Sequence, residues 1–268
     1  MSPYKAEFIK VDGIPEGYAQ TTPVEPGKRL PDGDVRIEVC GEGDADMIAE
    51  GFYTTFPEIF WTRREPVALR PSLEIRKSRL SARLRPTLSI PTIKWIKAVQ
   101  TSTGEVMGLA CWSLPSNPIY NHFMRSATTF YNLRSKIPYT DAEIESHWSH
   151  VDPSAWEDDM ARLDQERRDV MGSEPHWFLA PLLVWPGFQG RGVGKKLLEW
   201  AMEKADAAVP PTPMYLESAI TARGVYLHCG FVPTGTVSMV RRGPGVVKEG
   251  DGAEGQEGVL QENAEAKP

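Results

Sequence analysis

The hydrophobic pattern first predicts strands and a hairpin. Val35, Ile37 and Val39 alternate with charged residues, which is the period of a half-buried strand. Residues 94–100 and 106–113 predict two more strands, and the turn between them contains Gly104, as in an antiparallel hairpin. The folded region is therefore expected to begin with the first of these strands.

Two helices are predicted between that strand and the hairpin. Asp44 is placed to cap the first, which stops before Pro57. The second lies between Pro71 and Pro86, with its leucines towards the protein. Those leucines are Leu73, Leu80 and Leu84, and its basic residues are Arg76, Lys77, Arg79, Arg83 and Arg85. Such a run can bind an anionic partner, but we favour a solvated face that the acidic excess elsewhere offsets.

The second half of the chain predicts a central strand followed by a helix. Residues 177–184 are apolar on both faces, as in a strand that is covered on both sides. Apolar residues then recur with the helical period from Val193 to Ala205, and Pro210 prevents continuation. The elements predicted after this helix are a strand at 214–218, a short helix at 223–228 and a terminal pair of strands within 231–241.

A glycine-rich turn joins the central strand to its helix. This order places several backbone N–H groups and a helix N-terminus around one small volume, which favours an anion. Arg191, Lys195 and Lys196 add positive charge, and no acidic residue stands in the turn. The turn is not a Walker loop, because Gln189 and Lys196 occupy two required positions, nor a dinucleotide turn, because Lys195 replaces a glycine.

Two motifs in this half resemble those of a known family. Residues 182–186 (Leu-Leu-Val-Trp-Pro) and the Gln-x-x-Gly-x-Gly turn at 189–194 resemble the pyrophosphate-binding signature of the GNAT superfamily of acyl-CoA N-acyltransferases. Residues 226–231 (Tyr-Leu-His-Cys-Gly-Phe) resemble the Tyr-x-x-x-Gly-Phe element of the same fold. The resemblance implies a mixed α/β (α+β) GNAT fold, with a central parallel and antiparallel sheet flanked by helices.

The resemblance also implies the cosubstrate and its contacts. Acetyl-CoA, or a close acyl-CoA, would lie against main-chain groups of Leu182, Leu183 and Val184, and a backbone N–H near Val184 would polarise the acyl carbonyl. The residues expected to hold the pyrophosphate are Gln189, Gly190, Arg191, Gly192, Val193, Gly194 and Lys195.

The proton-transfer groups follow less directly. Family members often place Glu or His on the central strand, where this chain has Phe178. His176 on the same face and Glu217 on the next strand are the candidate bases, and each has a structural alternative as a hydrogen-bonding group. The resemblance places Tyr226 beside the thioester sulfur as the general acid, unless its ring only packs under the pantetheine.

Three stretches differ from the rest of the predicted domain of residues 34–242. Residues 1–33 form a Pro/Gly-rich extension, and the acidic, Gly-rich residues 243–268 are expected to be disordered and dispensable. Residues 114–174 are an insertion that should cover the sheet and set substrate specificity. Its helices are predicted from Asp141 and from a capping box at Ser154 and Glu157.

Composition limits the partners. The net charge of −6 argues against a nucleic-acid partner, and no apolar run reaches the roughly 18 residues of a membrane span. The 3 cysteines fit neither a disulfide framework nor a metal pair, so we expect no metal and a cytoplasmic location.

The sequence thus predicts an N-acetyltransferase that moves a short acyl group from acyl-CoA directly to a primary amine of a small molecule, as a monomer or homodimer. Acylation of a protein or peptide amine would require an open groove instead of a closed pocket. A catalytically silent CoA-binding regulatory domain is a further alternative, because the strand glutamate is missing.

Overall fold

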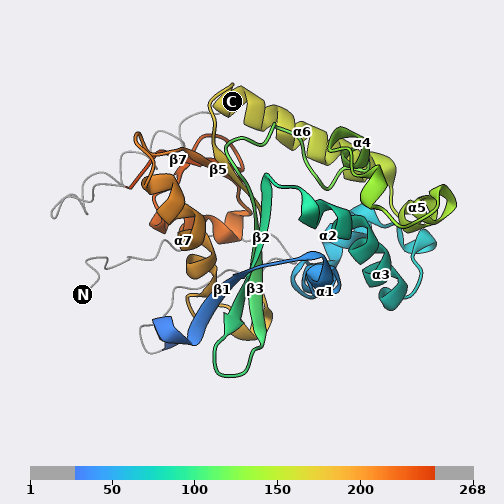
Figure 1. Ribbon diagram of the computed structural model, residues 1–268, viewed down its shortest axis with the longest axis horizontal. Coiled ribbons are helices and arrows are strands. Elements are labelled where there is room, and N and C mark those ends of the chain that lie inside the picture. Colours follow the sequence, from blue (N-terminus) through green and yellow to red (C-terminus); the bar gives the residue numbers. More distant parts are fainter. Residues whose placement is uncertain (1–27, 245–268) are drawn as a thin grey trace, which may run out of the picture.

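The computed structural model describes residues 28–244 (Figure 1), so the predictions for the start of the extension and for the tail lie outside the described residues. One mixed sheet has the strand order β1-β2-β3-β4-β5-β7-β6. Only β4 and β5 are parallel among the paired strands described. The strands are β1 (Val35–Val39), β2 (Ile93–Gln100), β3 (Val106–Ser113), β4 (Trp177–Val184), β5 (Met214–Glu217), β6 (Val232–Pro233) and β7 (Ser238–Arg241).

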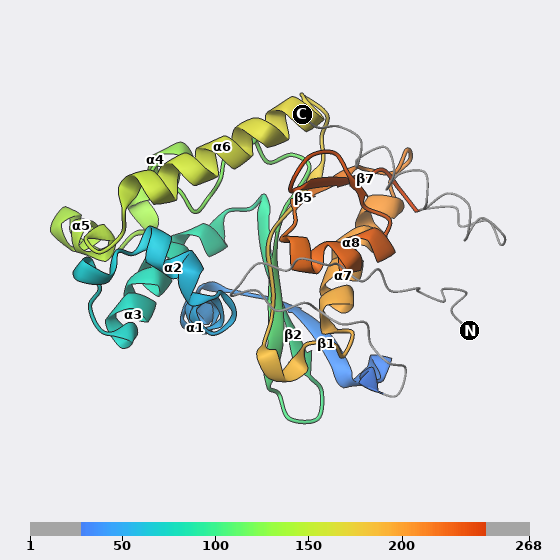
Figure 2. The same cartoon turned by 180° about the vertical axis from the view of Figure 1, so that it is seen from behind.

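Helices cover both faces of this sheet. Figures 1 and 2 show α7 and α8 on one side and α1, α2 and α3 on the other, with α6 running along one end. The helices are α1 (Ala45–Thr55), α2 (Glu58–Arg64), α3 (Leu73–Leu84), α4 (Ala127–Phe130), α5 (Asp141–Trp148), α6 (Pro153–Met171), α7 (Val193–Asp206) and α8 (Arg223–His228). None of the helices within residues 28–244 is long and apolar enough to cross a membrane.

β4 and β5 separate along their length. They pair only as far as Leu179 of β4. Opposite β3, Ala110 faces Leu182 whereas Trp112 faces Leu179, so β4 carries one extra residue at this point. This is a β-bulge, a feature that occurs often beside active sites. Beyond Leu179, the β5 side of β4 is therefore an open strand edge.

The alternation of side chains along β4 separates two apolar cores. Leu179, Leu182 and Val184 pack in the core beneath α7. Phe178 and Leu183 point to the opposite face, towards the side of α1 and α6. The predicted covering of both faces of the central strand is thus confirmed.

The strands, the hairpin and the helices at 193–206 and 223–228 form where the pattern predicts them, whereas several helix starts differ. α2 was not predicted. Asp44 does precede α1, but its carboxylate does not cap that helix and instead binds the Lys97 ammonium at 2.6 Å. The capping box at Ser154 and Glu157 is wrong, because α6 begins at Pro153 and the Asp152 carboxylate caps it, accepting from the Ala155 N–H at 2.9 Å.

The basic helix α3 also differs from its favoured interpretation. Arg76 is 8% exposed and Arg83 has a buried guanidinium, so a wholly solvated basic face is wrong. Leu80 and Leu84 are buried as predicted, whereas Leu73 is 46% exposed. Because an arginine has a long apolar stem, sequence patterning cannot distinguish an exposed position from one at which the head group is enclosed.

Candidate active site

The glycine turn ends in a left-handed residue at the start of α7. Gly192 has φ 87° and is the N-cap of the helix, and Gly190 has φ 71°. Side chains other than hydrogen disfavour both conformations. No side chain caps this helix end, so its first N–H groups stay available for an anion.

Gln189 ties this turn to the central strand. Its side-chain Nε2 donates to the carbonyl oxygen of Val184 at 3.0 Å. A Cβ on Gly194 would lie 3.5 Å from a methyl carbon of Leu182, so the start of α7 rests directly on β4. The geometry thus gives Gln189 a structural task, and contact with a pyrophosphate remains a prediction.

The charges around the turn are partly paired. Lys195 lies 3.4 Å from Glu199, and Lys196 lies 2.9 Å from Asp32. The segment that carries Asp32 packs onto the turn, because the Leu30 N–H donates to the Arg191 carbonyl at 3.1 Å. The turn itself contains no acidic residue, but the fold brings an acidic residue to it from far away in the sequence.

Leu182, Leu183 and Val184 lie on the open edge of β4. Leu182 and Leu183 pair with β3, which leaves their other edge towards the gap beside β5. The main chain can therefore offer hydrogen-bonding groups to a ligand that enters between the strands. This position agrees with the contacts that the sequence predicts, and their use by a ligand remains a prediction.

Tyr226 lies on the α7 side of this gap. It is 7% exposed and shares a core with Leu182 and Val184. Its ring meets Phe231 edge-on with the ring centres 6.0 Å apart. Burial raises the pKa of the Tyr226 phenol well above its usual value, so the hydroxyl keeps its proton at neutral pH. It lies within α8, not at the start of that helix.

His176 lies just before β4 and is 8% exposed. Its Nδ1 is 2.7 Å from the Glu174 carbonyl oxygen, which can only accept, so this nitrogen carries the proton. Burial lowers the pKa of His176, which keeps the ring neutral. The contacts described for it are thus those of a local structural histidine.

Glu217 lies on the α6 side of the sheet, two residues from Tyr215 on the same face of β5. Its Oε1 and the Tyr215 hydroxyl are both buried, and the two side chains interact closely enough for each to shift the pKa of the other. Burial raises the pKa of Glu217 to about 8, although the positive charge of Arg167 opposes this rise. A carboxylate of this kind can accept a proton close to neutral pH.

The sequence did not identify Arg167 and Asp164, which lie on the inner face of α6. Arg167 is 2% exposed and donates to Asp164 at 3.1 Å. The guanidinium lies 3.8 Å from the centre of the Phe178 ring, and Asp164 also accepts from the Asn121 N–H at 2.7 Å. In the sequence, only their helical spacing from Trp156 indicates this position. That spacing places both charged residues on the same buried face of the helix as Trp156.

The candidate groups lie on opposite faces of the sheet near the point where β4 and β5 separate. The glycine turn with the uncapped start of α7 and a protonated tyrosine lie on the α7 side, and a buried carboxylate with a raised pKa lies on the α6 side. Within residues 28–244 no cluster of three or more His, Cys, Asp or Glu side chains is placed to hold a metal. That these groups bind a phosphate-bearing cosubstrate and transfer protons is a prediction.

Comparison with known proteins finds one family model that matches part of the chain. The model of the acetyltransferase (GNAT) domain matches residues 159–233, which include α7, the glycine turn and most of α6. This segment is therefore similar to GNAT acetyltransferase domains, and the mixed sheet described above agrees with that fold. Among curated proteins, none matches this chain.

Solved structures that resemble the chain are distant. A Staphylococcus aureus N-acetyltransferase has 12% identity and a TM-score of 0.47, with 76% of this chain and 99% of that chain covered. A mosquito arylalkylamine N-acetyltransferase-like protein has 15% identity and a TM-score of 0.46, with 77% and 99% covered. A Brucella melitensis GNAT acetyltransferase in complex with acetyl-CoA has 16% identity and a TM-score of 0.38, with 80% and 92% covered.

Proposed function

We propose that this protein transfers an acetyl group from acetyl-CoA to the primary amine of a small molecule. The observation that supports a small acceptor most is the position of α6, whose Arg167 covers the Phe178 ring where β4 and β5 still pair, just before the gap. The insertion therefore covers the side of the sheet that carries Glu217. An extended peptide needs an open groove, so this cover favours a small acceptor.

The cosubstrate would bind on the α7 side. Its pyrophosphate would lie at the N-terminus of α7 near Gly190 and Gly192, where backbone N–H groups and the helix dipole favour negative charge. The acyl arm would follow the open edge of β4 past Leu182. In this arrangement the thioester lies between Tyr226 and Glu217.

Transfer would need one base and one acid. An alkylammonium has a pKa of about 10.4, so Glu217, directly or through a water, would take a proton from the acceptor before attack. The amine nitrogen forms a bond to the thioester carbon while the C–S bond breaks, and Tyr226 would give its proton to the departing thiolate. The ammonium proton is thereby moved to Glu217 and the phenol proton to the thiol, while the second proton that the nitrogen must lose to become an amide passes to the Tyr226 phenolate and restores the phenol. The products are the N-acetyl amine, the free thiol and one proton held on Glu217.

Two alternatives keep some support. Acylation of a protein or peptide amine would require α6 to move away from the sheet. A catalytically silent CoA-binding domain would agree with Phe178 at the strand position where the resemblance implies a glutamate. Turnover with small arylalkyl and alkyl amines, compared with peptides that carry a free N-terminus or lysine, separates these functions. We expect kcat/KM at least tenfold higher for the best small amine, and the reverse order would contradict a small acceptor.

A further inference from the structure

A buried arginine lies at the interface between α3 and the insertion. The stem of Arg83 is partly exposed, but Nε, Nη1 and Nη2 of its guanidinium are all buried and have no hydrogen-bond acceptor within residues 28–244. Its Cζ lies 4.5 Å from the ring centre of Trp148 and 4.9 Å from that of Trp156. The rings stabilise the positive charge, but they leave the N–H donors of the fork unsatisfied.

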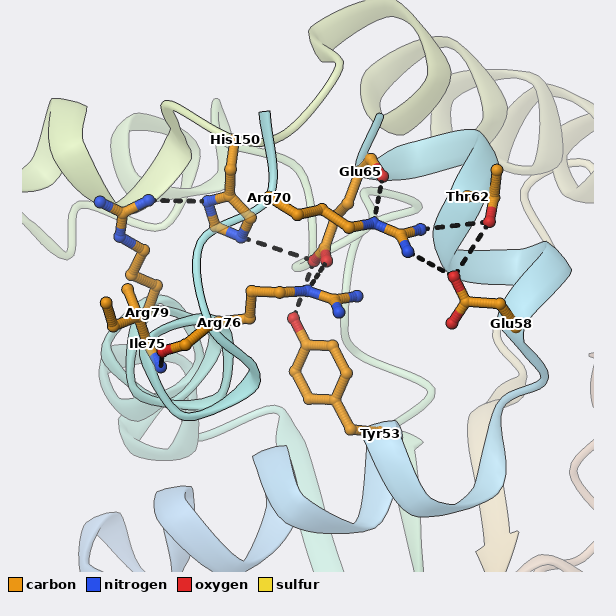
Figure 3. Close-up of polar contacts among 10 residues, drawn as sticks. Tyr53, Glu58, Thr62, Glu65, Arg70, Ile75, Arg76, Arg79 and His150 are labelled. Carbon is orange, nitrogen blue, oxygen red and sulfur yellow. Dashed lines mark hydrogen bonds and ion pairs between the residues drawn. The ribbon is translucent and has the colours of Figure 1, made fainter. Parts of the chain in front are cut away.

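The nearby buried carboxylate is already occupied. Glu65 is 0% exposed and receives Arg76 at 2.6 Å and the Tyr53 hydroxyl at 2.8 Å, as Figure 3 shows. His150 lies 3.6 Å from the same carboxylate and is itself contacted by Arg79. Glu65 helps to keep Arg83 charged through space, but it makes no ion pair with it among the described contacts.

Arg83 lines a cavity. The space measures about 40 Å³, and its walls come from α3, α5, the start of α6 and the chain around α4. A single water needs about 10–15 Å³ on this measure, so the cavity can hold a few waters or one small molecule. Most of the wall is apolar, including Leu80, Met124 and Ile144, and its polar groups include His122 and His147.

The charge of this cavity favours an anion. Burial lowers the pKa of Arg83 to about 10, so the guanidinium remains a cation at neutral pH. Burial lowers the pKa of His122 to about 3, and the charge of Arg167 adds to this effect. Burial also lowers the pKa of His147, to which the charges of Arg83 and Arg79 contribute. Both rings are then neutral at physiological pH, and Arg83 dominates the local charge.

We propose that this cavity binds a small organic monocarboxylate, such as acetate or propionate, with its two oxygens on the Arg83 fork. A guanidinium fits a carboxylate through two parallel hydrogen bonds, which would satisfy the buried donors. The apolar wall would hold the alkyl group, whereas a phosphate would meet that wall with unpaired oxygens. The cavity lies between α3 and the insertion, so the site is separate from the glycine turn and its occupancy does not depend on acetyl transfer.

Thermal unfolding of the full chain tests this site with propionate as the probe. Propionate at about one hundred times its Kd should raise Tm on the order of 5 °C, in a saturable manner. Propionamide, which has a similar shape without charge, and chloride at the same ionic strength should each give less than a quarter of that shift. An equal shift with propionamide or chloride would overturn the carboxylate site.

Arg83→Met tests the residue, and Lys77→Met on the same helix is its matched control, because Lys77 pairs with the exposed Glu50 and Glu74. We expect Arg83→Met to lose the propionate shift while its Tm without ligand stays equal or rises, since an unpaired buried cation is removed. Lys77→Met should keep the shift. A propionate shift that survives in Arg83→Met would contradict the proposal. A wild type whose Tm does not change with propionate, together with a lower Tm of ligand-free Arg83→Met, would also contradict it.

If Arg83→Met does not fold, Arg83→Lys decides the question. It retains the positive charge but lacks the planar fork. We expect propionate to bind at least tenfold more weakly to this variant than to the wild type. Unchanged affinity would show that the fork does not hold the carboxylate.

Discussion

The guanidinium of Arg167 lies 3.8 Å from the centre of the Phe178 ring, where helix α6 crosses the central strand. The resemblance implies a glutamate at this strand position, and the chain places an aromatic ring beneath a cation there. The carboxylate that faces the same region is Glu217, from the neighbouring strand. If the reaction needs a base on this side, the structure offers it from β5 and not from β4.

Glu217→Gln should lower kcat/KM by about 10² to 10⁴-fold if this carboxylate is the base. In the wild type, kcat/KM should rise with pH and level off above the pKa of about 8, because the base must lose its proton first. The variant should lose this rise. Glu105→Gln, in the exposed turn between β2 and β3, is the control and should behave as the wild type. An unchanged pH profile in Glu217→Gln would exclude this role.

The same carboxylate should make stability depend on pH. Its pKa in the folded protein is raised above the ordinary 4.5 to about 8, so the folded state holds a proton that the unfolded chain releases between these values. Its stabilising contribution is therefore present at low pH and is lost as pH rises through about 8. Glutamine stays neutral at every pH. The free energy of unfolding of Glu217→Gln, measured relative to that of the wild type, should therefore increase from pH 5 to pH 9. Urea denaturation at both pH values measures this difference, and a constant difference would contradict the raised pKa.

Tyr226→Phe removes only the phenol proton and keeps the ring in its core. If Tyr226 is the acid, kcat should fall by about 10² to 10⁴-fold while acetyl-CoA affinity barely changes. Tyr139→Phe, in the insertion, is a control for the loss of a hydroxyl elsewhere. Retention of more than about a third of wild-type kcat, with chemistry shown to be rate-limiting, would mean that water or the amine supplies the proton.

Gly51→Ala tests the packing of α1 on the end of the central strand. A Cβ at Gly51 would lie 2.3 Å from a ring carbon of Trp185, so the helix or the indole must shift. We expect a loss of about 1–3 kcal/mol in the free energy of unfolding, as for other overpacked cores. Gly187→Ala, which meets nothing within 4 Å, is the matched control and should be close to neutral. Equal stabilities of the two variants in urea denaturation would contradict this packing.

Local pattern was sufficient for the elements that build the sheet. The strand at 177–184, the glycine turn and the helix from Val193 could be predicted because period, turn residues and cap positions agree within one short stretch. The short helix α2 could not, since seven residues after a proline give too few turns for a reliable period.

The buried charges were beyond sequence patterning for a different reason. Arg83, Asp164 and Arg167 become buried only because segments distant in the sequence enclose them. Asp32 also meets a distant partner, because it reaches Lys196 from the N-terminal side of the domain, but it stays exposed. A pattern that counts charged residues as exposed assigns the three buried residues to the surface, whereas the segments that pack over them decide their burial.

The most direct test of the central claim is thiol release from acetyl-CoA in the presence of a panel of small primary amines, with the N-acetyl product identified by mass spectrometry. We expect amine-dependent release with one acetylated product per thiol, and loss of both turnover and acetyl-CoA binding in Gly192→Glu, which places a charged side chain on a left-handed residue at the phosphate turn. Acetyl-CoA binding by the wild type without any turnover across the panel would contradict the enzyme. Unchanged binding in a folded Gly192→Glu protein would contradict the site.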